Sequence, residues 1–103
     1  MGGQKVKYAP VEGMLCCSSA GRDRKRYLLI VKVIDSEYVY VADGDIRRIE
    51  NPKKKKLKHL RLTPKTDAAL QEKLLKGMNV TDSDIRKAIA VLTEKGDGIT
   101  EEQ

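Results

Sequence analysis

The residues of this sequence best suited to a chemical task are two clusters of basic side chains. One is a run of four lysines at positions 53–56, which continues through Lys58 and Arg61. The other lies at positions 22–26 and holds three arginines and one lysine. A run of one charge sign repels itself, and a bound polyanion relieves that repulsion and releases condensed counterions. Arginine also presents a planar set of donors that suits phosphate. Both clusters therefore predict contact with a nucleic acid backbone.

The candidate nucleic-acid contacts share a positive charge and lie within residues 22–61. They are Arg22, Arg24, Lys25, Arg26, Arg47, Arg48, Lys53, Lys54, Lys55, Lys56, Lys58 and Arg61. Other interpretations stay open. The lysine run is also typical of a solvated loop, or of a nuclear localisation signal in a eukaryotic host, and the arginine cluster is also typical of a solvated surface.

Two tyrosines have two possible roles. Tyr38 and Tyr40 occupy the side of a predicted strand away from Val39 and Val41. Exposed aromatic rings beside basic residues stack on unpaired bases. Such rings also provide an apolar surface against which helices pack, and we expect this packing role for both tyrosines.

No set of residues in the sequence is typical of an enzyme or a metal site. His59 is the single histidine, and no Ser, Cys or carboxylate stands where it would form a recognisable catalytic set with it. Cys16 and Cys17 are adjacent, which disfavours a disulfide between them and fits two thiols in a reducing compartment. We therefore expect a non-enzymatic protein with no cofactor and no metal.

Length and composition predict one compact domain. The chain has 103 residues, of which 40% are hydrophobic and 35% charged, and its net charge is +6. Residues 1–66 hold 16 lysines and arginines against 7 acids, whereas residues 67–103 hold 5 against 8. A polyanion should therefore bind mainly to residues 1–66. The longest apolar run, at 27–31, is far shorter than the ~20 residues of a membrane span, so we expect a cytoplasmic protein without membrane contact.

The apolar pattern predicts a mainly β domain in the first two thirds of the chain. Short strands separated by turn residues favour a small barrel, because closure removes exposed sheet edges. In one of these strands Leu29, Val31 and Val33 are assigned to the core, with Lys32 on the wetter face. The predicted strands are 11–18, 27–34, 38–41, 45–50 and 57–62, with the lysines at 53–56 in a loop.

Beyond Pro64 the spacing becomes helical. One helix is predicted over 66–76 with Thr66 as its N-cap, and a second over 82–95 with Thr81 as its N-cap and Asp84 in the acidic position of a capping box. We expect the two helices to pair with each other and to dock on the barrel. The expected division is a flexible tail (1–10), a barrel (11–63), a helical extension (64–96) and a frayed tail (97–103).

Several motifs of the predicted barrel resemble a KOW motif. They lie at residues 11–13, 19–27, 30–35 and 41–44, and the lysine run with Leu57-Lys58-His59-Leu60 follows them. Together these segments resemble large-subunit ribosomal proteins of the archaeal and eukaryotic type (the fourteenth-e family) and short KOW-domain RNA-binding proteins of Gram-positive bacteria. Residues 83–88 resemble the helical extension of the bacterial members. Gly21 and Asp23 match the loop pattern of the family, and Lys25 stands where the family has a second glycine.

The resemblance implies an SH3-like barrel that binds ribosomal RNA through its basic loops. We therefore expect an RNA-binding protein of the translation apparatus, with possible protein contact through the C-terminal helices. Two alternatives stay open. One is a protein-interaction module whose basic clusters meet an acidic protein surface, and the other is a transcription-accessory module with the same fold.

Overall fold

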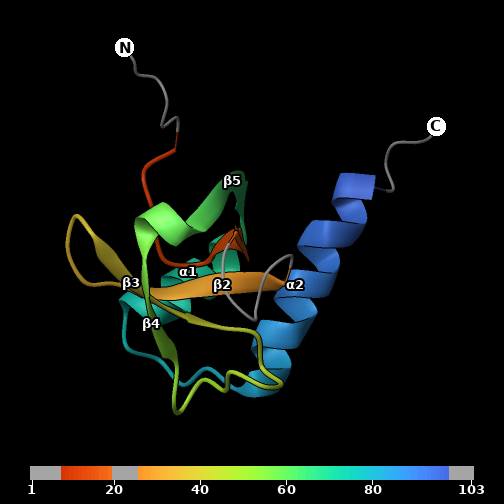
Figure 1. Ribbon diagram of the computed structural model, residues 1–103. Helices are drawn as coiled ribbons and strands as arrows, with labels where there is room; N and C mark the ends of the chain where they lie inside the picture. The colour runs from red at the N-terminus through yellow and green to blue at the C-terminus, as the bar shows by residue number, and fades with distance from the viewer. Residues whose placement is uncertain (1–7, 20–25, 98–103) are drawn as a thin grey trace.

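The computed structural model describes residues 8–19 and 26–97, which form a sheet followed by two helices (Figure 1). The predictions for the outermost residues of both tails, and for Arg22, Arg24 and Lys25, lie outside the described residues. Five strands form the sheet: β1 (Met14–Ser18), β2 (Tyr27–Val33), β3 (Tyr38–Ala42), β4 (Lys53–Lys56) and β5 (Leu60–Thr66).

Each strand is antiparallel to its neighbours, and the order in the sheet is β4-β3-β2-β1-β5. A single turn of 3-10 helix, η2 (Leu57–His59), joins β4 to β5, and the helices α1 (Ala68–Leu75) and α2 (Asp82–Asp97) follow. The chain is thus mainly β with two C-terminal helices, as the sequence predicts. Within the described residues, no helix is both long and apolar enough to cross a membrane.

The sheet curls so that its edge strand β4 approaches β1. Lys55 of β4 places its Nζ 3.4 Å from Ser18 Oγ of β1, although β3 and β2 separate these strands in the sheet. The backbone of η2 spans the same gap. It bonds at one end to Glu37, just before β3, at 2.8 Å and at the other end to Ser19, just after β1, at 2.9 Å.

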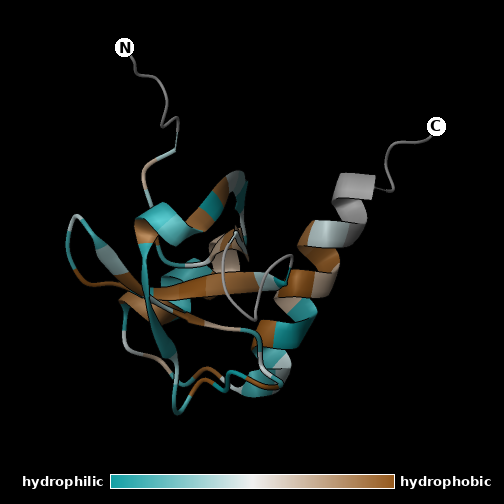
Figure 2. Ribbon diagram, in the orientation of Figure 1, coloured by the Kyte–Doolittle hydropathy of each residue, from teal (hydrophilic) through white to brown (hydrophobic). Residues whose placement is uncertain are grey.

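Curling divides the buried side chains into two clusters, one on each face of the sheet. The inner cluster, on the concave face, consists of Met14, Cys16, Leu28, Ile30, Val39, Val41 and Leu60. The outer cluster, under the helices, consists of Leu15, Leu29, Val31, Ala42, Leu70, Ile85, Ala88 and Leu92. Strand β2 contributes to both, and Figure 2 shows it as an apolar ribbon over most of its length.

A β-bulge in β2 changes the face that its later residues occupy. The register with β3 shifts between Ile30 and Lys32. Leu29 belongs to the outer cluster, whereas Val33, four residues on, packs against the inner cluster. Regular alternation would keep both on one face, and an extra residue in the strand reverses this. The prediction that Val33 shares a face with Leu29 and Val31, with Lys32 opposite them, is therefore wrong beyond the bulge.

The connection from β3 to β4 also differs from the prediction. Residues 45–50, expected as a strand, form turns instead. The cause is the carboxylate of Asp43, which accepts hydrogen bonds from the backbone N–H groups of Asp45 at 2.8 Å and Arg47 at 2.9 Å. A side chain that bonds its own following backbone favours a turn over a sheet ladder.

The lysine run forms a strand where the sequence predicts a loop. Residues 53–56 pair with residues 38–41 of β3 along their full length. Because side chains alternate in a strand, like-charged neighbours point to opposite faces, which lowers their repulsion. The strand expected at 57–62 begins only at Leu60, since η2 takes up the residues before it.

Both helices begin with a side-chain cap. Asp67, and not the predicted Thr66, caps α1 by accepting a hydrogen bond from the Leu70 N–H at 3.0 Å. At the start of α2, the Asp84 N–H donates to Thr81 Oγ1 at 3.1 Å, and the Thr81 N–H donates to the Asp84 carboxylate at 3.0 Å. This is the predicted capping box, with Asp in the place of Glu or Gln.

The β3–β4 loop is fastened to the first turns of α2. The carbonyl of Gly44 accepts a hydrogen bond from Arg86 Nη1 at 2.6 Å, and the Ile49 N–H donates to the Asp82 carboxylate at 2.7 Å. Arg48 Nε lies 3.8 Å from the same carboxylate. Gly44 has a φ of +79°, and a Cβ there would overlap the Asp82 carbonyl oxygen. Two features therefore require glycine at this position: the positive φ of the backbone and the close approach of α2.

Two glycine substitutions separate these requirements. Gly77→Ala carries the cost of a positive φ alone, because φ is +71° and no atom lies within 4 Å of the added Cβ; that cost is about 1–2 kcal/mol. Gly44→Ala should lower the free energy of unfolding further, because the loop must also move off α2. Urea unfolding of both variants measures the difference, and equal losses would show that the loop is not packed on the helix.

Candidate nucleic-acid interface

The four lysines of β4 divide into two pairs by strand alternation. Lys54 and Lys56 are exposed, whereas Lys53 and Lys55 are partly buried and stand opposite Val41 and Val39 of the inner cluster. Lys54 and Lys56 therefore project from the outer face of the sheet. Charged lysines on an edge strand also oppose pairing with a strand of another molecule.

Lys55 is partly buried and reaches toward the interior of the fold. Its Nζ lies 3.4 Å from Ser18 Oγ, and the Ser18 side chain is fully buried. Burial raises the pKa of the neighbouring Cys16 thiol to about 12, with Cys17 adding to the rise and the positive charge of Lys55 opposing it. Cys16 is thus a neutral thiol packed in the core. Lys55 supports the curled sheet rather than an exposed surface.

The bulge in β2 brings a further lysine to the outer face. Lys32 pairs with Tyr40 of β3, and Tyr40 pairs with Lys54 of β4, so the three form one row across the sheet. Tyr38 pairs with Lys56 in the next row. We call this surface the lysine–tyrosine face. It consists of Lys32, Tyr38, Tyr40, Lys54 and Lys56.

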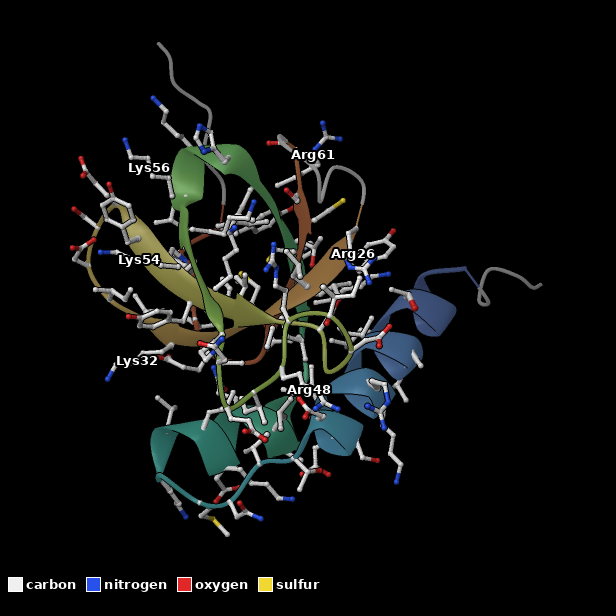
Figure 3. The ribbon with its side chains drawn as sticks, turned by 60° about the horizontal axis from the view of Figure 1, so that its bottom comes forward. Arg26, Lys32, Arg48, Lys54, Lys56 and Arg61 are labelled. Atoms are coloured by element: carbon white, nitrogen blue, oxygen red, sulfur yellow. The ribbon has the colours of Figure 1, made fainter. Side chains whose placement is uncertain are left out.

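Lys32 is a residue of this face that the sequence does not identify as a contact. Its signal is a single charged residue within the apolar run of β2, but regular alternation without the bulge places it on the face opposite Leu29, Val31 and Val33. Figure 3 shows Lys32, Lys54 and Lys56 along one side of the molecule. In the described part of the chain, none of the three forms an ion pair with a carboxylate. Their charges are therefore available to a partner.

The two tyrosines of this face have different surroundings. Tyr40 packs against the outer cluster, so the packing role predicted for it is confirmed. Tyr38 lies among the lysines instead. The Nζ of Lys54 is 4.6 Å from the centroid of its ring, and the Nζ of Lys56 is 5.9 Å from it. Both distances fall within the range of cation–π attraction.

The backbone of Tyr38 is fixed by the turn before it. The carboxylate of Asp35 accepts hydrogen bonds from the N–H groups of Glu37 and Tyr38, both at 2.8 Å. These bonds, with a smaller contribution from the charge of Lys54, lower the pKa of Asp35. The carbonyl of Tyr38 in turn accepts from the N–H of Ile34 at 3.0 Å. The ring is therefore presented from a well-bonded turn.

The basic residues continue from β4 into η2 and β5. Lys58 and His59 are exposed in η2, and Arg61 is exposed on β5. Figure 3 shows Lys56 and Arg61 on either side of η2.

The other predicted arginines lie apart from the lysine–tyrosine face. Arg26 Nε is 2.7 Å from the Asp43 carboxylate, and Arg48 lies beside the start of α2 within reach of Asp82 (Figure 3). Arg47 is partly buried, and its N–H donates to Asp43. The structure therefore gives the charges of Arg26 and Arg48 a partner within the fold.

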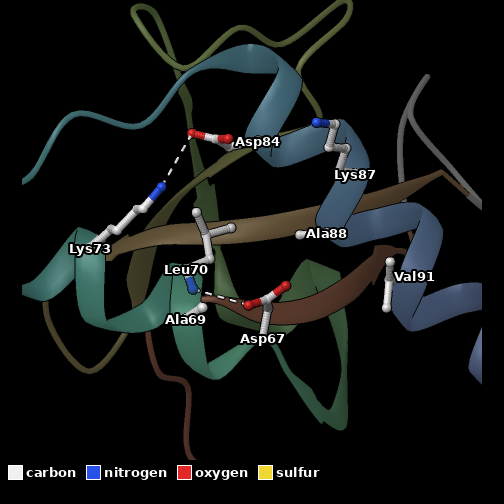
Figure 4. Close-up of a pocket in the computed structure, with 8 residues that line it drawn as sticks. All are labelled: Asp67, Ala69, Leu70, Lys73, Asp84, Lys87, Ala88 and Val91. Carbon is white, nitrogen blue, oxygen red and sulfur yellow. Dashed lines mark hydrogen bonds and ion pairs between the residues drawn. The ribbon is translucent and has the colours of Figure 1, made fainter.

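A shallow groove of about 190 Å³ separates α1 from α2 (Figure 4). Leu70 and Ala88 form part of its apolar lining. Its rim carries both charge signs, and Lys73 of α1 lies 3.9 Å from Asp84 of α2. The groove is therefore not an extension of the basic surface.

Comparison with known proteins adds no family to these observations. The sequence matches no family model, and no curated protein matches it significantly. The likeness to KOW-domain proteins therefore stays a prediction from the sequence.

The Arg26–Asp43 contact should make the free energy of unfolding fall as the solution becomes acidic. Burial alone would raise the pKa of Asp43, but hydrogen bonds from Arg26 and from the N–H groups of Asp45 and Arg47 lower it overall. A carboxylate with a lowered folded-state pKa stabilises the fold above its unfolded pKa of about 3.9, and this contribution is lost as the pH falls through the folded value.

Asp43→Asn should therefore reduce stability at neutral pH and leave a smaller further loss on acidification. Urea unfolding between about pH 7 and about pH 2 measures both effects. Asp45→Asn is the matched control, because that carboxylate is 76% exposed and lies 4.0 Å from Arg26. Similar pH profiles for wild type and Asp43→Asn would contradict the prediction.

Proposed function

We propose that this chain is a small, non-enzymatic RNA-binding protein of the translation apparatus that binds ribosomal RNA in the cytoplasm. The proposed contact surface is the lysine–tyrosine face, extended by Lys58 and Arg61. One observation carries the proposal: three lysines project from neighbouring positions of one sheet face and form no ion pair within the described residues. Unpaired ammonium groups held together in this way favour a polyanion.

The distribution of charge supports a nucleic acid. The sheet region holds most of the positive charge of the chain, whereas the segment with the helices has more acids than bases. The sequence also assigns Arg22, Arg24 and Lys25 to the interface, and these residues lie outside the described part of the chain. An acidic protein surface is the alternative partner, and the salt dependence described below tests it.

The proposal includes an SH3-like barrel of the KOW type. The strand order, the curled sheet and the single 3-10 turn between β4 and β5 support this assignment. The assignment to ribosomal RNA rests on the resemblance of the sequence to KOW-domain ribosomal proteins. Sedimentation of the protein with ribosomal particles in a gradient of cell lysate tests it directly.

RNA affinity should fall steeply as salt rises. Contact with ~5 phosphates implies a log–log slope of about −3.5 to −4.5. The double variant Lys54→Gln/Lys56→Gln should bind more weakly and show a slope less steep by about 1.4–1.8, because two phosphate contacts are lost. Fluorescence anisotropy with a labelled ribosomal RNA fragment measures both quantities.

The matched control removes the same charge elsewhere. Lys76→Gln/Lys87→Gln neutralises two exposed lysines of the helical region, and it should retain nearly the wild-type affinity and slope. Equal loss in both variants would show that net charge alone drives binding. A slope near zero for the wild type would reject a phosphate-dominated interface.

A further inference from the structure

We infer that the lysine–tyrosine face binds a single-stranded segment of RNA, with one unpaired base stacked on the ring of Tyr38. This inference rests on the proposed RNA binding and specifies the conformation of the RNA at that surface. It assigns Tyr38 as the base platform and Lys54 and Lys56 as contacts to the adjacent phosphates.

The first support is the position of the Tyr38 ring. Tyr38 is partly buried and, unlike Tyr40, is not among the residues that pack against the outer cluster under the helices. The Nζ atoms of Lys54 and Lys56 lie 4.6 and 5.9 Å from the centroid of its ring. Tyr40, two residues on, packs against the outer cluster and serves the core. Tyr38 is therefore the tyrosine of this face that a ligand reaches.

The second support is that the backbone of Tyr38, which carries the ring, is fixed before RNA binds. The N–H and carbonyl of Tyr38 are both bonded within the β2–β3 turn, and β4 holds its other side in register. With its backbone fixed, a tyrosine has only two side-chain torsions left to order when a base stacks on its ring, so it loses little conformational freedom. Each stacked base contributes markedly to affinity, and it does so for any base because each has a π face.

The third support is that Lys54 can exchange its contact with the tyrosine ring for a contact with a phosphate. Without a ligand, the ammonium of Lys54 lies against the ring, a weak attraction at an exposed site. A phosphate gives that ammonium a charged hydrogen-bond partner, which is the stronger interaction. Binding of the backbone therefore draws the lysine away and uncovers the ring for the base.

A duplex does not use this platform. Paired bases are stacked on one another, so their faces are inaccessible, whereas bases in loops, bulges and ends are free to stack on an aromatic side chain. A duplex gains the lysine contacts alone. The face should therefore prefer single strands, and this preference should depend on Tyr38.

The experiment compares a labelled single-stranded oligonucleotide with its duplex form by fluorescence anisotropy. Tyr38→Leu should weaken single-strand binding about ten-fold or more, with an unchanged salt slope and little effect on the duplex. Tyr38→Phe keeps the ring and should retain affinity. Tyr27→Leu is the aromatic control, because Tyr27 is 47% exposed. It is the first residue of β2, at the end of that strand away from the β2–β3 turn and Tyr38.

Photocrosslinking of the wild-type protein gives a measurement that needs no variant. RNA that contains 5-bromouridine should crosslink to the peptide that carries Tyr38, identified by mass spectrometry. A crosslink at Tyr27 with none at Tyr38, or full single-strand affinity in a folded Tyr38→Leu variant, would overturn the inference.

The outcomes distinguish this inference from the proposed function. If Lys54→Gln/Lys56→Gln loses affinity while Tyr38→Leu does not, RNA binding stands and the base platform is rejected. If the lysine variant binds RNA as tightly as the wild type, the proposed interface itself is rejected. Equal losses of single-strand and duplex binding in Tyr38→Leu would reject stacking.

Discussion

Strand β2 buries side chains on both faces of the sheet, and most of the architecture follows from this requirement. Leu28 and Ile30 need an apolar environment on one side, and Leu29 and Val31 need one on the other. Curling of the sheet provides the first, since side chains of β1, β3 and β5 then pack with Leu28 and Ile30 on the concave face. The helices provide the second. The extended β2 therefore explains why a small sheet carries a helical extension at all.

The helices cover the outer face incompletely, and the uncovered part is where the basic surface lies. Their contacts with the sheet reach Tyr40, whereas Tyr38 and the exposed lysines of β4 lie beyond them. The β3–β4 loop limits how α2 can shift, because Gly44 and Ile49 bond to its first turns. The same contacts that complete the core thus set the boundary of the lysine–tyrosine face.

The sequence predicted local features better than features that depend on a neighbouring strand. The capping box of Thr81 and Asp84 follows from residues within one turn of each other, and it is present. The bulge after Ile30 depends on β3 and on the carboxylate of Glu12, which accepts the Val33 N–H at 3.0 Å. No local pattern encodes it, so the position of Lys32 could not be predicted.

The lysine run also takes a conformation that depends on a neighbouring strand and that its own sequence does not predict. Four lysines have low strand propensity, and β4 forms because the edge of β3 offers backbone partners along its full length. As a strand, the run no longer acts as one positive cluster: Lys55 turns to Ser18, while Lys54 and Lys56 face water. A protein strand added to this edge would have to bury ammonium groups, which is costly. A phosphate backbone lying over the face would bond one donor of each exposed ammonium group and leave the others hydrated. Strand alternation is therefore better suited to the proposed polyanion on the face than to a peptide at the edge.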